Sequence, residues 1–130
     1  MSDLPAIRLR GVTFGYDATP VLEDVDLDVE PRAFASVVGP NGGGKSTLLK
    51  LLLGLLDPRR GTIEVLGAAP DEARRRIGYL PQQADLDPRF PVTVEDVALT
   101  GRLRGLRPIG PFRRGDRARA GAALRSVGAE

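Results

Sequence analysis

A glycine-rich string containing one lysine is the part of this sequence whose residue types and spacing are best suited to chemistry. It runs Gly39-Pro40-Asn41-Gly42-Gly43-Gly44-Lys45-Ser46-Thr47, and Gly-x4-Gly-Lys-Ser within it matches the P-loop pattern. Glycines accept left-handed backbone angles and carry no Cβ, so successive backbone N–H groups can turn inward around a phosphate. The string therefore predicts a phosphate-binding loop in which every residue is a candidate contact.

Two side chains of the string would do more than line the phosphate. Lys45 would bring a mobile positive charge to the β- and γ-phosphates, and Ser46 would bring a hydroxyl ligand to Mg²⁺. Lys50 is the only other lysine, so a lysine at this point of the pattern is informative. A glycine turn that only capped a helix would not need it. We therefore expect a nucleoside triphosphate with Mg²⁺ as the ligand.

A phosphate-binding loop of this kind joins a strand to a helix. Residues 34–38 form a nearly continuous apolar run, which is typical of a strand buried on both faces of a parallel sheet. Residues 48–56 are rich in leucine and predict a buried helix that Asp57 and Pro58 close. Residues 77–80 predict a second buried strand. The fold class expected is α/β, a P-loop NTPase core with a parallel sheet flanked by helices.

The amino-terminal residues predict a different sheet. Residues 6–14 and 21–29 alternate apolar and polar side chains, which indicates neighbouring antiparallel strands with one face in solvent. Residues 62–66 predict another strand, and residues 71–76 predict a short helix with Asp71 as its N-cap. We expect residues of about 6–30 to form an antiparallel β subdomain, and the strand at 62–66 and the helix at 71–76 to belong to the nucleotide-binding core.

Helical patterns return after residue 82. Thr93 is expected to cap a helix whose first turn carries Glu95 and Asp96. An arginine-, glycine- and proline-rich connection follows over 102–112, and a last helix is expected over 116–127. The carboxyl-terminal part of the chain is therefore expected to be helical.

Composition excludes several kinds of chemistry. The chain has no cysteine and no histidine, so disulfides, zinc sites of those ligands and Ser-His-Asp catalysis are excluded within it. No basic leader and no long apolar segment is present, which predicts a cytoplasmic protein without a membrane span. Residues 97–130 hold eight arginines against two acids, so an anionic partner competes with a solvated helix face as their explanation.

The full string from Gly39 to Thr47, followed by Leu48 and Leu49, resembles the ATPase subunit of ATP-binding cassette (ABC) transporters. GTPases, by contrast, read guanine with Asn-Lys-x-Asp, and neither lysine here follows an asparagine. The ABC family usually carries Ala or Ser where this chain has Gly43. Glycine there should loosen the unbound loop without removing a backbone donor.

Two further stretches support the resemblance. Phe14-Gly15-Tyr16 is similar to the family's aromatic loop, which implies that Tyr16 stacks on adenine. Ile77-Gly78-Tyr79-Leu80-Pro81-Gln82 is similar to the strand that enters the family's Q-loop. This implies that Gln82 reaches Mg²⁺ and the attacking water, an amide being able both to ligate metal and to donate a hydrogen bond. Gln83 is the competing assignment.

The resemblance also implies a domain organisation and a substrate. The antiparallel part would cover about 6–30, the P-loop core about 34–82, and the Q-loop with the start of a helical subdomain about 82–130. The wording of residues 90–102, and of Pro-Phe-Arg-Arg-x-Asp-Arg after them, is most similar to the subfamily that imports zinc or manganese. The implied partners are a second nucleotide-binding subunit, as a homodimer, and transmembrane permease subunits, with the chain peripheral on the cytoplasmic face. No nucleic acid is expected.

Three elements of the family's hydrolytic machinery are missing from this sequence. It contains no Leu-Ser-Gly-Gly-Gln, no apolar strand ending in Asp-Glu after residue 82, and no switch histidine. The chain is therefore expected to be the amino-terminal part of a longer subunit and to be inactive as an ATPase by itself. The alternative from another class is a soluble ABC-type ATPase that acts on nucleic acid or ribosomes. The long coiled coil of the DNA-repair members would show heptads after Gln82, and none is present.

Overall fold

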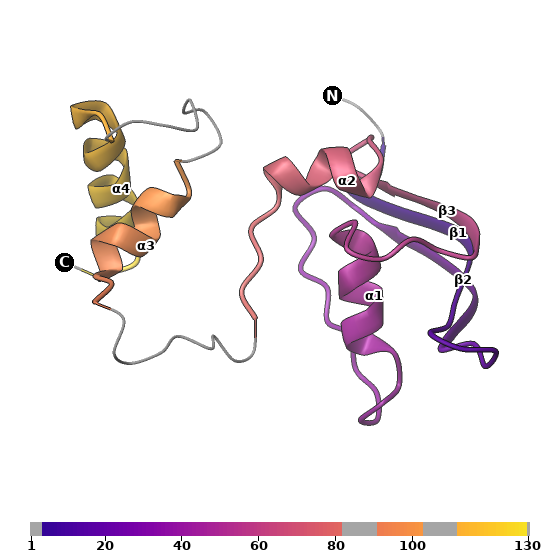
Figure 1. Ribbon diagram of the computed structural model, residues 1–130. Helices are drawn as coiled ribbons and strands as arrows, with labels where there is room; N and C mark the ends of the chain where they lie inside the picture. Colours follow the sequence, from indigo (N-terminus) through magenta and orange to yellow (C-terminus); the bar gives the residue numbers. More distant parts are fainter. Residues whose placement is uncertain (1–3, 82–90, 103–111, 130) are drawn as a thin grey trace. The chain divides into compact units, whose positions relative to one another are not determined.

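The computed structural model describes residues 4–81, 91–102 and 112–129 (Figure 1). The chain divides into two compact units, Met1–Tyr79 and Leu80–Glu130. The first holds a three-stranded sheet and two short α-helices, and the described residues of the second include the helices α3 and α4. The candidate phosphate-binding loop and the candidate aromatic residue both belong to the first unit.

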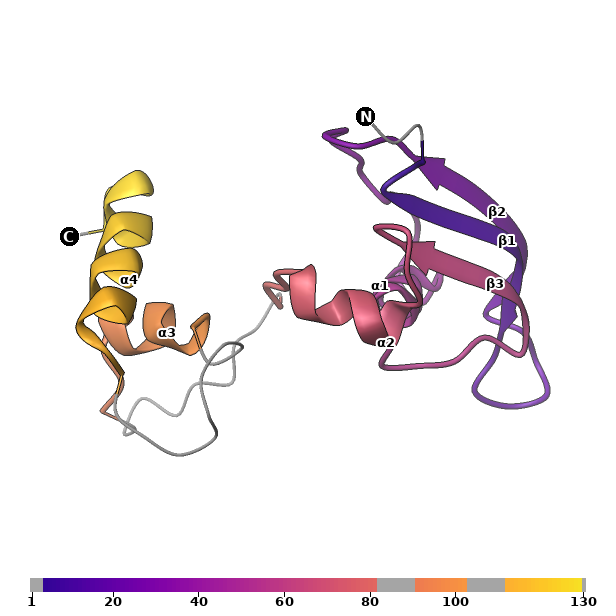
Figure 2. The same ribbon diagram turned by 90° about the horizontal axis from the view of Figure 1, so that it is seen from above.

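The sheet of the first unit is antiparallel, with strand order β2-β1-β3. Strand β1 (Ile7–Phe14) lies between β2 (Leu22–Val29) and β3 (Arg60–Val65). Figure 1 and Figure 2 show α1 and α2 on the same side of this sheet. The predicted antiparallel pairing of the first two strands is confirmed, and the third predicted strand begins two residues earlier than the sequence indicated.

A β-bulge at Gly11 interrupts the simple alternation of β1. Gly11 has a φ of 56°, and the register with β2 shifts between Leu9 and Val12. The extra residue turns both Leu9 and Val12 toward the core, although three positions separate them. Asp24, on the facing strand, also has a positive φ, of 49°. The bulge therefore aims Phe14, and the turn after it, at the helical side of the sheet.

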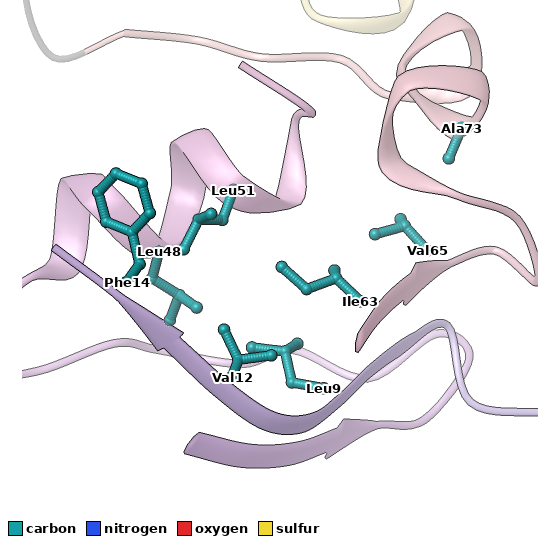
Figure 3. Packing of buried hydrophobic residues seen from close by; sticks show 8 residues of the cluster. All are labelled: Leu9, Val12, Phe14, Leu48, Leu51, Ile63, Val65 and Ala73. Atoms are coloured by element: carbon teal, nitrogen blue, oxygen red, sulfur yellow. The ribbon is translucent and has the colours of Figure 1, made fainter. Parts of the chain in front are cut away.

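The core of the first unit fills the space between the sheet and α1 (Lys45–Leu52) (Figure 3). Leucine side chains on one face of α1 meet apolar side chains that β1 and β3 present to it. The buried cluster comprises Leu9, Val12, Phe14, Leu48, Leu51, Ile63, Val65 and Ala73. Burial of this apolar area fixes α1 against the sheet, and with it the loop that precedes α1.

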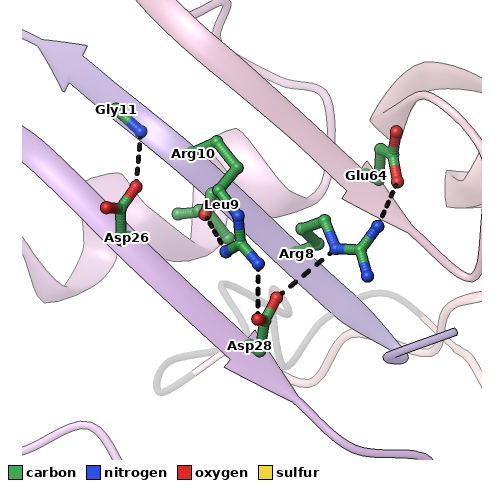
Figure 4. Close-up of polar contacts among 7 residues, drawn as sticks. All are labelled: Arg8, Leu9, Arg10, Gly11, Asp26, Asp28 and Glu64. Carbon is green, nitrogen blue, oxygen red and sulfur yellow. Dashed lines mark hydrogen bonds and ion pairs between the residues drawn. The ribbon is translucent and has the colours of Figure 1, made fainter.

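The opposite face of the sheet is polar (Figure 4). The guanidinium group of Arg10 donates to the Asp28 carboxylate at 2.5 Å, and Arg8 lies between Asp28 and Glu64 at 3.5 and 3.9 Å. The contact with Arg10 lowers the pKa of Asp28 below its ordinary value. These pairs are at least one-third exposed, so water screens them and they stabilise the fold little. The expected solvent-facing side of the amino-terminal sheet is confirmed.

The two buried strands predicted for a parallel sheet are not strands in this structure. Residues 34–38 and 77–80 lie outside every strand, and the exposed fractions of Phe34, Val38 and Leu80 are 98%, 89% and 89%. A strand forms only where a neighbour satisfies its backbone N–H and C=O groups, and no described strand pairs with either segment. Residues 34–38 and 78–80 are therefore exposed, whereas Ile77 is partly buried against the core.

The helices of the first unit also differ from expectation in detail. Helix α1 begins at Lys45 and ends at Leu52, where Gly54 with a φ of 64° turns the chain away, so it starts and stops before the predicted 48–56. Helix α2 (Pro70–Ala73) and the 3-10 turn η1 (Arg74–Arg76) occupy the predicted helix. Asp71 is not the N-cap. Ala69 holds that position because Pro70, with its fixed φ, is suited to the first helical turn.

In the part of the second unit that the structure describes, α3 (Val94–Thr100) packs against α4 (Arg114–Ser126), and Leu99 and Ala120 are buried. The predicted cap is confirmed: Asp96 N–H donates to Thr93 Oγ1 at 3.1 Å, and Thr93 N–H donates to Asp96 Oδ2 at 2.9 Å. Helix α4 begins two residues before its predicted start. Asp116 accepts from Arg113 N–H at 3.0 Å in the first turn, which fixes that start.

Candidate functional site

The glycine-rich string forms a tight loop that leads directly into α1. Gly42 and Gly44 both have a φ of 81°, a left-handed conformation that residues with a Cβ rarely adopt. Gly43 N–H donates to the Pro40 carbonyl oxygen at 3.1 Å and closes the turn between them. Gly44 is the N-cap of α1, and Lys45 is its first residue. The loop therefore ends at the amino terminus of a helix, where unpaired N–H groups and the helix dipole favour an anion.

The glycines of the loop differ in how much room their surroundings leave for a side chain. A Cβ built on Gly39 or Gly42 would meet no atom within 4 Å, so this side of the loop is open. A Cβ on Gly44 would lie 3.0 Å from Leu22 Cδ2 and 3.2 Å from Val21 Cγ1. Gly44 is buried against β2, whereas Gly42 is exposed. The loop is thus anchored to the sheet at one end and open to a ligand at the other.

The ammonium group of Lys45 folds back over the loop. Its Nζ donates to the carbonyl oxygens of Gly39 and Pro40 at 2.8 and 2.6 Å. Both acceptors are exposed neutral carbonyls, which water can replace at small cost. A phosphate oxygen offers a stronger, charge-assisted partner to the same group. The side chain is therefore held at the loop by contacts that it can exchange for a phosphate.

Ser46 and Thr47 point to different environments. Ser46 is exposed in the first turn of α1, so its hydroxyl is accessible to a metal ion held by phosphate oxygens. Thr47 is buried, and its Oγ1 lies 3.4 Å from the hydroxyl oxygen of Tyr16. The structure thus brings the predicted aromatic residue to the predicted phosphate loop, although 31 positions separate Tyr16 from Thr47.

Tyr16 lies on the turn after β1 and packs on Phe14. The two ring centroids are 5.1 Å apart and the rings are nearly perpendicular, at 89°. Gly15 between them is required, because a Cβ there would overlap the Thr19 carbonyl oxygen. In the sequence, Phe14 stands out only as part of the Phe14-Gly15-Tyr16 string. Phe14 is aromatic, ends a strand and lies two positions before Tyr16. These features are the sequence signal that could have indicated a contact between the two rings.

Gln82 and Gln83, the two candidates for the Q-loop, lie outside the described residues. Within the described ranges, no three or more His, Cys, Asp or Glu side chains gather in a way that could hold a metal ion. A magnesium ion fits this chain as a companion of bound phosphate, ligated by the exposed Ser46 hydroxyl. In the same described part of the chain, no helix combines the length and apolar character needed to cross a membrane.

The loop, the helix that follows it and the lysine at the first helical position define the class of P-loop NTPases. Residues 22–130 match the family described as ABC transporter. The chain belongs to the ABC transporter family. The α/β P-loop NTPase fold class predicted from the sequence is confirmed by a solved "ATP binding subunit of ABC transporter". That protein has a TM-score of 0.65 and 33% identity, covering 79% of this chain and 44% of the other.

The chain is similar in sequence to ATP-binding proteins of metal transport systems. The zinc transport system ATP-binding protein TroB of Treponema pallidum is 40% identical over 95% of this chain and 46% of its own length. The manganese transport system ATP-binding protein MntB of Bacillus subtilis is 39% identical over 94% of this chain and 49% of its own length. The predicted resemblance to zinc and manganese transport subunits is confirmed. The chain spans somewhat less than half the length of these two relatives.

Proposed function

We propose that this chain binds ATP with Mg²⁺ and forms the nucleotide-cradling part of the energy-coupling subunit of an ABC transporter. The observation that carries the proposal is the position of Lys45. Its ammonium group lies over the open side of a glycine loop at the start of α1, held only by two exposed carbonyl oxygens. A cation so placed at a helix amino terminus is suited to the β- and γ-phosphates of a nucleotide.

The string from Gly39 to Thr47 is proposed to surround the triphosphate through its backbone N–H groups. Lys45 exchanges its contacts with Gly39 and Pro40 for phosphate oxygens, and the Ser46 hydroxyl ligates Mg²⁺. Bound Mg²⁺ neutralises charge on the β- and γ-phosphate oxygens. Gln82, or Gln83 in its place, remains the proposed second contact to the metal on the strength of the sequence.

Tyr16 is proposed to bind the adenine ring. The tyrosine is 56% exposed, and its hydroxyl lies beside Thr47 at the loop. A large aromatic face in solvent, next to a phosphate site, is suited to stacking on a planar base. The two ends of a nucleotide would therefore contact two parts of one compact unit.

The wider role is proposed from the relatives. TroB and MntB are named as ATP-binding proteins of zinc and manganese transport systems, which supports transport of one of these metal ions as the process that this subunit drives. Import is the direction that we propose, from the resemblance of residues 90–102 to the importing subfamily. We infer that it works at the cytoplasmic face of the membrane, with a second nucleotide-binding subunit and transmembrane permease subunits. Hydrolysis is not proposed for this chain by itself, because its sequence contains no Leu-Ser-Gly-Gly-Gln, no apolar strand ending in Asp-Glu after residue 82 and no histidine.

Calorimetric titration with Mg-ATP tests the nucleotide site. Lys45→Ala should abolish measurable binding, since it removes the only side-chain cation of the loop. Lys50→Ala is the matched control, because Lys50 is the other lysine of the chain and is exposed on the same helix. It should bind as the unaltered chain does. Equal ATP binding by Lys45→Ala and Lys50→Ala would overturn the assignment.

A further inference from the structure

Tyr16, the aromatic residue proposed to stack on the base, contacts two other residues of its own unit. Tyr16 is exposed, yet its ring packs at 89° on Phe14, which is only 7% exposed and belongs to the core cluster. In an edge-to-face pair, each ring keeps at least one face that the partner ring does not touch. Phe14 can therefore fix the Tyr16 ring and still leave it a free face.

A second contact comes from the phosphate loop. The hydroxyl oxygens of Tyr16 and Thr47 are 3.4 Å apart, which is longer than a typical O–H···O hydrogen bond and makes this a weak polar contact. Thr47 is 6% exposed and follows Ser46 in the first turn of α1. The tyrosine is thus supported by the core of the sheet on its ring and by the P-loop helix at its hydroxyl.

We propose that Phe14 and Thr47 are positioning residues. They hold the Tyr16 side chain in the orientation that stacks on adenine, and so they increase the contribution of the base to the affinity for ATP. This inference rests on the proposed function of the loop and assigns a role that the P-loop pattern does not contain. An exposed tyrosine free to change rotamer would lose that freedom on stacking, whereas a ring already fixed loses less. Phe14 and Thr47 act through Tyr16 and need not touch the base.

A comparison of two ligands separates the contribution of the base to binding affinity from that of the phosphates. Mg-ATP and Mg-tripolyphosphate both engage the loop, but only ATP engages Tyr16. Phe14→Leu should weaken ATP binding by roughly threefold to tenfold, the strength of an aromatic pair, and leave tripolyphosphate binding unchanged. Phe34→Leu is the matched control, since it makes the same change at a residue that is 98% exposed. It should alter neither affinity.

A double-mutant cycle tests whether Phe14 acts through the tyrosine. In a Tyr16→Leu background, Phe14→Leu should have no further effect on ATP affinity, because the ring that it positions is gone. Persistence of its full effect in that background would overturn the proposal. An equal loss of ATP and tripolyphosphate in Phe14→Leu would also overturn it, by showing that the substitution damages the loop itself.

Near-isosteric variants test the hydroxyl contact without disturbing the core. Tyr16→Phe and Thr47→Val should each weaken ATP binding, and together they should weaken it no more than the stronger of the two, since they remove one shared contact. Simple addition of their effects would overturn the link. If the unaltered chain binds neither ATP nor tripolyphosphate, the proposed function itself fails. If it binds both and Phe14→Leu loses neither, only the positioning role fails.

Discussion

The Nζ of Lys45 lies 2.6 Å from the carbonyl oxygen of Pro40, so the cation proposed for phosphate rests on the backbone of its own loop. The contact is exposed and its acceptor is neutral. Such a hydrogen bond exchanges readily with water, and its net stabilisation is small. We therefore expect the lysine side chain to contribute little to the stability of the fold.

This relationship predicts that Lys45→Ala separates binding from stability. Its free energy of unfolding should stay within about 1 kcal/mol of the unaltered chain, because only exposed hydrogen bonds are removed. Urea denaturation followed by circular dichroism measures it. A loss of several kcal/mol would show that the lysine contacts with Gly39 and Pro40 hold the loop together, contrary to this account.

Gly44 and Gly42 share a φ of 81° but should respond differently to alanine. Gly42→Ala introduces only left-handed strain, about 1 kcal/mol, since its Cβ would meet no atom within 4 Å. Gly44→Ala adds a clash with Leu22 and Val21 and should cost about 2–3 kcal/mol in all. Urea midpoints of the two variants give the comparison. Equal destabilisation would contradict the anchoring of the loop against β2.

Asp116 makes the second unit sensitive to acid. Arg102 Nε donates to its carboxylate at 3.0 Å and Arg113 N–H donates at 3.0 Å, and these contacts hold its pKa below the ordinary value of 3.8. The unfolded chain therefore takes up this proton more readily. The stabilisation is present above pH 3.8 and is lost as the pH falls through the lower folded pKa.

Asp116→Asn should remove that loss of stability in acid. Circular dichroism measures helix content from neutral pH down to about pH 2. The variant should lose less helix over this pH range than the unaltered chain does. Asp17→Asn removes the same charge from an exposed turn and serves as the control. An unchanged acid transition in Asp116→Asn would show that this carboxylate does not secure α4.

The exposed apolar segment at residues 34–38 predicts self-association. Phe34 is 98% exposed and Val38 is 89% exposed, and unpaired apolar chain readily pairs with another copy. Phe34→Glu should shift sedimentation velocity profiles at high concentration toward the monomer. Leu55→Glu, at an exposed leucine outside the segment, should not. A concentration-independent monomer for the unaltered chain would contradict the prediction.

Sequence patterns correctly predicted those elements whose contacts are made between neighbouring parts of the chain. The alternation of β1 and β2, and the reciprocal contacts of Thr93 and Asp96, depend on residues close in sequence or directly facing. The bulge at Gly11 was missed because Leu9, Val12 and Phe14 fit an alternating strand only once its register has shifted. Pattern reasoning assumes the register that a bulge breaks.

The predictions for residues 34–38 and 77–80 were wrong for a different physical reason. Their apolar composition is suited to a buried strand, but a strand also needs a partner for its backbone. The sequence could predict that the string from Gly39 to Thr47 forms a loop before a helix, whereas the nucleotide contacts of this loop and of Tyr16 stay predictions. It could not predict that Phe14 supports the tyrosine, because that role depends on the turn that brings the two rings together.

A two-dimensional 1H–15N NMR titration tests the central claim most directly. Addition of Mg-ATP should shift the backbone amide signals of residues 39–47, because their N–H groups are proposed to surround the triphosphate. The same titration of Lys45→Ala should leave those signals unmoved, and Lys50→Ala should reproduce the original shifts. Shifts confined to other residues, or identical shifts in the Lys45→Ala variant, would contradict a phosphate site at this loop.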